Sequence, residues 1–192
     1  MKKRIAIFAS GSGSNAQKIM EHFKRHNDAE VAIILTNNPQ AYVLQRADNF
    51  EIPSHIFGRK EFYDGDEVIR LLKNLNIDLI VLAGFLWLVP QSLLQAFPNK
   101  IINLHPALLP KYGGKGMYGD NVHKAILEAG EEESGITIHF VNEHFDEGEI
   151  IHQSRFKIEP GDNLEMVKFK GQQLEHTHFP RVVEGLLKKM KS

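Results

Sequence analysis

In Ile101-Ile102-Asn103-Leu104-His105-Pro106-Ala107-Leu108-Leu109-Pro110, an apolar β-branched run leads into a turn flanked by prolines. Such a run is typical of the end of a buried strand. Because side chains alternate along a strand, Asn103 and His105 point to the same side. Pro106 cannot donate a ladder hydrogen bond and disfavours helix at the preceding residue, so the strand ends there. The stretch predicts an amide and an imidazole at one strand tip, where open α/β sheets bind ligands.

Apolar strands alternate with helical stripes on the N-terminal side of this stretch. The run at residues 78–84, which is apolar after Asp78, is typical of a central parallel strand covered on both faces. Alternation of this kind predicts an α/β fold, with a doubly wound, mostly parallel sheet and helices on both faces. Strands are predicted at residues 4–9, 30–36, 52–57 and 78–84, and helices at residues 16–23, 42–50, 64–75 and 120–129.

The C-terminal part departs from this alternation. Residues 135–141 and 149–156 flank a polar turn, which predicts an antiparallel β-hairpin. A turn at residues 160–162 starts a long C-terminal helix, and we expect Gly171 and Pro180 to interrupt it. Because no linker or repeat separates the parts, we expect a single domain over residues 1–192.

Composition excludes several classes of protein. The formal net charge of −1 gives no basic field for nucleic acid or an anionic membrane. The absence of cysteine excludes disulfides, cysteine-based zinc sites and a thiol nucleophile. No apolar run reaches the ~20 residues needed to span a bilayer. We therefore expect a cytoplasmic protein without a nucleic acid or membrane partner.

A glycine-serine loop follows the first strand directly. Ser10-Gly11-Ser12-Gly13-Ser14-Asn15 lies between strand and helix, a layout in which free N–H groups and the helix dipole favour an anion. Position 16 is alanine and no Gly-Lys-Ser/Thr follows, so a single phosphate is favoured over a dinucleotide. The alternative is a tight turn in which Ser14 or Asn15 caps the helix.

Two further loops flank the predicted strand tips. Phe85-Leu86-Trp87-Leu88-Val89-Pro90 is either core or the wall of a pocket for a flat ring. Four glycines between Lys111 and Gly119 predict a mobile loop, which is either a lid or a flexible connection.

Asp146, in a polar Asp-Glu-Gly turn, completes a candidate catalytic set. Asn103 is suited to donate to a carbonyl oxygen as charge develops, and His105 to transfer protons near neutral pH. Asp146 is suited to orient the ring and favour its protonated form. Because no serine or cysteine nucleophile motif is present, direct acyl transfer is favoured over a covalent intermediate. The alternative for these residues is a structural hydrogen-bonded pair and an ordinary turn.

Four motifs resemble the phosphoribosylglycinamide formyltransferase family of folate-dependent enzymes. The motifs that begin at Asn103 and at Gly135 are shared by folate-dependent formyltransferases generally. The Gly-Ser-Asn loop and the chain length favour this member of the group. The resemblance runs from residue 4 to about residue 180. The motifs are Ser10-Gly-Ser-Gly-Ser-Asn15, Leu82-Ala-Gly-Phe85, Asn103-Leu-His-Pro-Ala-Leu-Leu-Pro110 and Gly135-Ile-Thr-Ile-His-Phe-Val-x-x-x-x-Asp146-x-Gly148.

The resemblance implies formyl transfer from 10-formyltetrahydrofolate to the glycinamide amine of phosphoribosylglycinamide, in de novo purine biosynthesis. It implies that the amine attacks the formyl carbon directly, while Asn103 and protonated His105 stabilise the oxygen of the tetrahedral intermediate. A proton then passes from the amine to the folate nitrogen through His105 or water. The expected assembly is a monomer or homodimer.

The resemblance also assigns site residues, with Asn103, His105 and Asp146 as the catalytic group and His139 in support. Lys60 stands where an arginine is common, Leu86-Trp87 replaces a frequent Met-Arg, and the loop at residues 111–121 is longer and richer in glycine. The ribonucleotide is expected on Gly13, Ser14, Asn15, Gln172, Gln173 and Glu175, and the folate on Lys60, Leu86, Trp87, Leu88, Val89, Asn103, Asn142, Glu143, His144, Phe145 and Asp146.

Other functions are compatible with part of this motif pattern. A methionyl-tRNA or amino-sugar formyltransferase is expected to carry more chain after the domain, and a formyltetrahydrofolate hydrolase a regulatory domain before it. A non-catalytic nucleotide-binding module would use the loop around Gly13 alone. That alternative leaves Asn103, His105 and Asp146 without a purpose.

Overall fold

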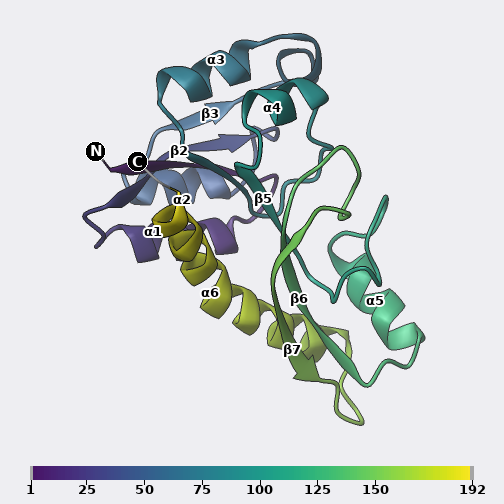
Figure 1. Cartoon of the computed structure of the whole chain (residues 1–192). Helices are drawn as coiled ribbons and strands as arrows, with labels where there is room; N and C mark the ends of the chain where they lie inside the picture. The colour runs from purple at the N-terminus through teal and green to yellow at the C-terminus, as the bar shows by residue number, and fades with distance from the viewer. Residues whose placement is uncertain (1, 191–192) are drawn as a thin grey trace.

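A seven-stranded sheet organises the computed structural model, which describes residues 2–190 (Figure 1). The strand order is β3-β2-β1-β4-β5-β6-β7. The first five strands in this order are parallel, whereas β6 is antiparallel to both β5 and β7. This arrangement confirms the predicted doubly wound, mostly parallel sheet and its antiparallel hairpin. The strands are β1 Lys3–Phe8, β2 Ala29–Thr36, β3 Ser54–Ile56, β4 Leu79–Leu82, β5 Ile101–His105, β6 Glu133–Phe140 and β7 Ile150–Lys157.

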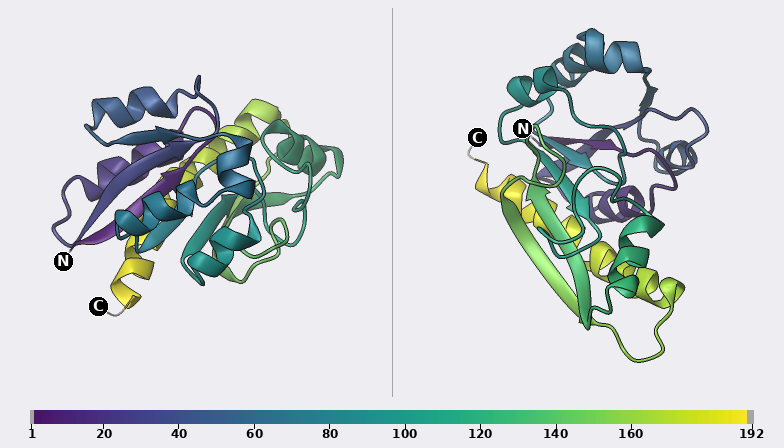
Figure 2. Two further views of the ribbon diagram at one scale, coloured as in Figure 1. Left: turned by 90° about the horizontal axis from the view of Figure 1, so that it is seen from above. Right: turned by 90° about the vertical axis from the view of Figure 1, so that its right-hand side faces the viewer.

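Helices cover both faces of the sheet because its central strands are apolar on both sides. In β1, Ile5 and Ile7 contribute to the core under α1, α2 and α6, while Ala6 and Phe8 contribute to the core under α3 and α4. The long helix α6 runs along β6 and β7 (Figure 2). The helices are α1 Ser14–Phe23, α2 Val43–Asn49, η1 Lys60–Asp64 (a π-helical turn), α3 Glu67–Asn74, α4 Gln91–Ala96, α5 Asp120–Glu128 and α6 Leu164–Lys189.

The chain reverses its direction of travel across the sheet at β1. It runs outward through β2 and β3, then returns to place β4 on the other side of β1. Ligands bind in open α/β sheets at such a switch point, outside the carboxyl ends of the strands. The loops that follow β1 and β4 meet there, since Ser10 N–H donates to the Gly84 carbonyl at 3.0 Å and Leu86 N–H to Ser10 Oγ at 3.1 Å.

The expected interruption of the C-terminal helix is wrong, because α6 runs unbroken through Gly171 and Pro180. A proline inside a helix costs about 3 kcal/mol, whereas each large apolar side chain buried contributes about 1.5–3 kcal/mol. Phe179, Val183 and Leu187 are buried on the face of α6 that packs on the sheet. Tertiary packing therefore outweighs the local propensity to break.

Two smaller features also depart from the sequence pattern. The helix predicted from residue 64 begins at Glu67, after the separate turn η1. Periodicity does not predict α4, because its six residues include a single buried one, Leu93. Across residues 2–190, no helix combines the length and the apolar character that crossing a membrane requires.

We expect Phe8→Ala to lower the free energy of unfolding by about 3–5 kcal/mol, because it empties a fully buried site. The Phe8 ring lies 5.4 Å from that of Phe85 and 5.7 Å from that of Phe57, centroid to centroid. Chemical denaturation measures the change. Phe169→Ala, at a side chain that is 61% exposed, is the matched control. An equal loss in the two variants would contradict the assignment of Phe8 to the core.

Candidate active site

A pocket of about 370 Å³ lies over the carboxyl ends of β4 and β5 and reaches Asn15 at the start of α1. It joins segments that are far apart in the sequence, from the glycine-serine loop to the final helix. Of the residues that the sequence singles out, the pocket lining includes Asn15, Leu86, Trp87, Leu88, Val89, Asn103, His105, His139, His144, Phe145, Asp146 and Glu175.

Strand pairing holds Asn103 and His105 at the pocket. Both belong to β5, and the antiparallel register places Asn103 opposite His139 and His105 opposite Thr137 on β6. Asp146 arrives from the loop between β6 and β7. Its Oδ2 lies 3.4 Å from His105 Nδ1, and its Oδ1 lies 3.4 Å from Asn103 Nδ2. The three candidate catalytic side chains therefore meet around one point.

The turn that presents Asp146 depends on its local backbone. Asp146 itself has a left-handed φ of 59°, which Asp tolerates better than most residues. Two residues later, a Cβ at Gly148 would overlap the carbonyl oxygen of Phe140. Glycine is therefore required at position 148 for the loop to close against β6.

His105 is almost completely buried, and both of its ring nitrogens face protein groups. Nε2 lies 2.8 Å from the Tyr112 carbonyl oxygen. A carbonyl only accepts, so Nε2 carries a hydrogen and the neutral ring keeps its lone pair on Nδ1, facing Asp146. Burial lowers the pKa of His105 below its ordinary value of 6.5, and the Asp146 charge and the Tyr112 carbonyl raise it only in part. The structure thus favours a neutral ring whose Nδ1 is a base.

His139 fixes the side-chain amide of Asn103. His139 Nδ1 lies 2.8 Å from the Phe140 carbonyl oxygen and therefore carries the hydrogen, so Nε2 accepts from Asn103 Nδ2 at 3.2 Å. The Asn103 contacts with His139 and Asp146 are both longer than the usual ~2.9–3.0 Å of an N–H hydrogen bond. An acceptor placed closer in the pocket can therefore take one of the Asn103 hydrogens.

Neighbouring groups keep the carboxyl group of Asp146 ionised. Burial raises its pKa, but the neighbouring His139 and His105 rings and the Gly114 N–H, which donates to Oδ2 at 3.0 Å, lower it further than burial raises it. A carboxylate that stays charged is suited to stabilise a positive charge that forms on His105.

The glycine-serine loop leaves the N-terminus of α1 uncapped. The alternative in which Ser14 or Asn15 caps the helix is wrong, because Gly13 is the N-cap and makes no side-chain bond. Gly13 has a left-handed φ of 71°, and a Cβ there would overlap Val43. Asn15 instead donates to Glu175 Oε2 at 2.6 Å. Burial raises the pKa of Glu175, and the Asn15 hydrogen bond lowers it only in part.

The loop after β4 is both core and pocket wall. Phe85 is buried, whereas Leu86 is 51% exposed and lines the pocket. Trp87 also lines it, and its ring is held by the Arg59 guanidinium at 4.9 Å and by Tyr63, stacked at 5.9 Å. The aromatic cluster therefore fixes an apolar wall on this side of the site.

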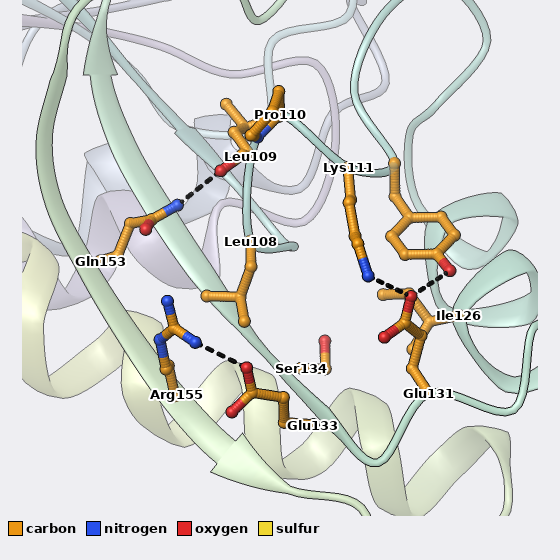
Figure 3. Close-up of a pocket in the computed structure, with 11 residues that line it drawn as sticks. Leu108, Leu109, Pro110, Lys111, Ile126, Glu131, Glu133, Ser134, Gln153 and Arg155 are labelled. Atoms are coloured by element: carbon orange, nitrogen blue, oxygen red, sulfur yellow. Dashed lines mark hydrogen bonds and ion pairs between the residues drawn. The ribbon is translucent and has the colours of Figure 1, made fainter.

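The segment between β5 and α5 is anchored on its far side, around a second pocket (Figure 3). Gln153 Nε2 donates to the Leu109 carbonyl at 2.9 Å, and Lys111 Nζ and Tyr112 Oη each donate to Glu131 Oε1, at 2.8 and 2.9 Å. These anchors fix the backbone from which the Tyr112 carbonyl contacts His105. Sequence reasoning missed them, because the contacts depend on the path of the chain after Pro106.

The pocket does not include every residue that the sequence singles out. It does include much of the glycine-rich segment, whose glycine content signals a loop without indicating that Met117 and Tyr118 line the site. Lys60 lies on η1 with an exposed side chain. The predicted residues outside the lining are Gly13, Ser14, Lys60, Asn142, Glu143, Gln172 and Gln173.

We expect Gln153→Ala to lower kcat about 5–30-fold, the equivalent of about 1–2 kcal/mol, because the Leu109 carbonyl loses its anchor and the Tyr112 contact with His105 loosens. Steady-state kinetics of the reaction that the sequence resemblance implies, formyl release from a 10-formyl folate, measures the change. Gln45→Ala is the matched control, since Gln45 is exposed and donates to Asn49 on the same helix. An unchanged kcat in a folded Gln153→Ala protein would show that the anchor has no part in positioning the ring.

Comparison with known proteins gives one family. The sequence model described as "Formyl transferase" matches residues 3–183. The phosphoribosylglycinamide formyltransferase of Bacillus subtilis is 39% identical, over 96% of this chain and 95% of that protein. The chloroplastic phosphoribosylglycinamide formyltransferase of Arabidopsis thaliana is 40% identical over 96% of this chain, which spans 65% of that protein. The crystal structure of glycinamide ribonucleotide transformylase 1 from Geobacillus kaustophilus superposes with a TM-score of 0.88 at 38% identity, covering 97% of this chain and 100% of that one.

Proposed function

Because this chain belongs to the phosphoribosylglycinamide formyltransferases, enzymes of purine biosynthesis within the formyl transferase family, we propose that it uses 10-formyltetrahydrofolate as its formyl donor. The acceptor in this proposal is the glycinamide amine of phosphoribosylglycinamide, and the products are the N-formyl ribonucleotide and tetrahydrofolate. One observation carries the proposal. Asn103, His105 and Asp146 meet in a pocket that also reaches Asn15 and Glu175.

The ribonucleotide binds at the end of the pocket nearest α1. Its phosphate lies on Gly13, Ser14 and Asn15, which the uncapped helix N-terminus and the left-handed Gly13 support. Glu175 contacts the ribose and glycinamide end, together with Gln172 and Gln173 on the same helix. Gln172 Nε2 already lies 3.5 Å from Ser14 Oγ, which supports a shared site.

The folate lies against the apolar wall at the other end. Its ring contacts Leu86, Trp87, Leu88 and Val89 and the backbone of residues 142–146, which is supported by the exposed side chain of Leu86. The anionic tail leaves the pocket and reaches Lys60 on η1. A single ammonium there gives looser geometry than an arginine fork.

The transfer is a direct attack. The amine nitrogen bonds to the formyl carbon while the carbonyl oxygen becomes negative, and one Asn103 N–H turns from Asp146 to that oxygen. The amine gives a proton to Nδ1 of neutral His105, and Asp146 stabilises the resulting imidazolium. The bond between the formyl carbon and the folate nitrogen then breaks, and that nitrogen takes the proton from His105, directly or through water. The lowered pKa of His105 supports a neutral ring at the start, whereas the sequence alone favoured a protonated one.

We base the remaining parts of the proposal on the composition and the fold. The transfer itself requires no metal ion, and no nucleic acid or membrane takes part. Residues 1–192 act as one formyltransferase domain, as a monomer or homodimer, in the cytoplasm.

We expect Asn15→Ala to raise KM for the ribonucleotide about 10–100-fold with little change in KM for the folate, because a hydrogen bond to a charged group contributes about 1.5–3 kcal/mol. Initial rates with either substrate varied test this. Lys18→Ala, at a partly exposed position of α1, is the control. A rise in the folate KM instead would contradict the proposal, because it would place the folate rather than the ribonucleotide beside Asn15.

Isotope transfer tests the function as a whole. The donor carries a ¹³C label in its formyl group, and mass spectrometry follows the label with phosphoribosylglycinamide, an amino sugar or methionyl-tRNA as acceptor. The proposal predicts label in the phosphoribosylglycinamide product alone. Label released as formate without an acceptor would indicate a hydrolase, and label on either other acceptor alone would overturn the assigned substrate.

A further inference from the structure

Two histidines and a glutamate cluster at the end of α1 that is remote from the pocket. His22 lies in the last turn of α1, His26 follows the helix, and Glu184 reaches them from α6. One ligand atom from each of the three side chains lies within 4.8 Å of the other two. The active-site residues described above do not include them, and the seven-residue step along α1 from Asn15 to His22 spans about 10 Å.

The donor set has a specific chemistry. Two imidazole nitrogens and one carboxylate oxygen suit Zn²⁺ and similar transition ions, whereas Mg²⁺ and Ca²⁺ prefer oxygen alone. His22 Nε2 lies 2.8 Å from Glu184 Oε2. Ligands about 2.0–2.1 Å from a tetrahedral ion are about 3.3 Å apart, so this pair needs only a small movement. The side chains of His22 and His26 are 25% and 26% exposed, which leaves room for rotation and for entry of an ion.

Neighbouring groups orient the three side chains as outer partners do in metal sites. Lys188 Nζ binds Glu184 Oε1, which leaves Oε2 directed at His22. Asp28 Oδ1 lies 3.6 Å from His26 Nδ1. The rings of His22 and His26 are stacked, with centroids 4.7 Å apart, so one ring must rotate to direct both nitrogen lone pairs at a single ion.

We propose that His22, His26 and Glu184 bind one divalent transition-metal ion of the Zn²⁺ class, with water completing its coordination. Such an ion links α1 to α6 and binds the folded chain only, so it stabilises the fold without entering the transfer reaction. The ion joins the two helices that also carry Asn15 and Glu175, at their ends remote from the pocket.

Equilibrium dialysis and thermal unfolding of the full chain test the site with Zn²⁺, and with Mg²⁺ as the hard-ion control. We expect one Zn²⁺ per chain and a rise in Tm of about 5–10 °C at a free Zn²⁺ concentration about 100-fold above Kd, with no rise in Mg²⁺. His22→Asn and Glu184→Gln should each abolish the bound ion and the rise. Each variant is compared with and without metal, so a lower starting Tm does not affect the result.

His178→Asn is the matched control, because His178 lies on α6 in a different stacked pair, with His152 at 4.9 Å. This variant should keep both the bound ion and the rise in Tm. Loss of binding in His178→Asn, or binding that survives in His22→Asn, would overturn the assignment. Absence of Zn²⁺ binding by the unaltered chain would overturn it as well.

Discussion

His105→Asn should lower kcat about 10²–10⁴-fold, because proton transfer by a positioned side chain contributes about that factor. Asparagine has no basic nitrogen, and its side chain is too short to replace Nε2 as the donor to the Tyr112 carbonyl. His105 is only 3% exposed, so circular dichroism and chemical denaturation must accompany the kinetics. His55→Asn on β3, outside the pocket lining, should keep normal turnover. Near-normal kcat in a folded His105→Asn protein would show that the His105 ring takes no part in the reaction.

The pH dependence of the unaltered enzyme follows from the same ring. The proposed reaction starts from neutral His105, so kcat/KM falls as the pH drops through the pKa of that residue. Because burial puts this pKa below 6.5, the acid limb of the profile should have its midpoint below 6.5.

Asp146→Asn should lower kcat about 10–10³-fold, because a carboxylate beside an imidazolium shifts its pKa by about 1–3 units. The amide keeps the shape and still accepts from the Gly114 N–H, so the variant removes charge. The Asp146 charge raises the pKa of His105, so its loss should move the acid limb of kcat/KM to still lower pH.

The neighbouring residue supplies the control for Asp146. Glu147→Gln removes one charge from an exposed side chain that is not part of the main pocket lining. It should leave both kcat and the acid limb in place. An acid limb that moves to higher pH in Asp146→Asn, or does not move, would contradict the proposed pairing with His105.

The fold follows from local patterns to a large extent. The apolar runs that become β1, β4 and β5 are continuous, so both buried faces are visible in the sequence. The continuity of α6 is not visible, because it depends on buried contacts that a local rule for Pro180 does not include. The six-residue helix α4 is too short and too exposed to produce a clear period.

The candidate site, like the fold, could be predicted from the sequence only in part. Strand alternation alone places Asn103 and His105 on one side, since both lie on β5. Their contact with Asp146 requires the antiparallel pairing of β5 with β6, which brings together residues about 40 positions apart. The roles of Tyr112 and Gln153 depend on a loop path that no periodic pattern encodes. Long-range geometry is what the structure adds to the sequence.

Order of addition in a single turnover separates direct transfer from its alternatives. The protein is mixed with an excess of 10-formyltetrahydrofolate over its sites, and folate absorbance is followed before and after one equivalent of phosphoribosylglycinamide per site is added. Direct attack through Asn103, His105 and Asp146 predicts no folate product until the ribonucleotide arrives, and then one equivalent with its formylated product. Release of one equivalent per site beforehand would reveal a formyl-enzyme intermediate, and continuous release would reveal hydrolysis, either of which contradicts direct transfer.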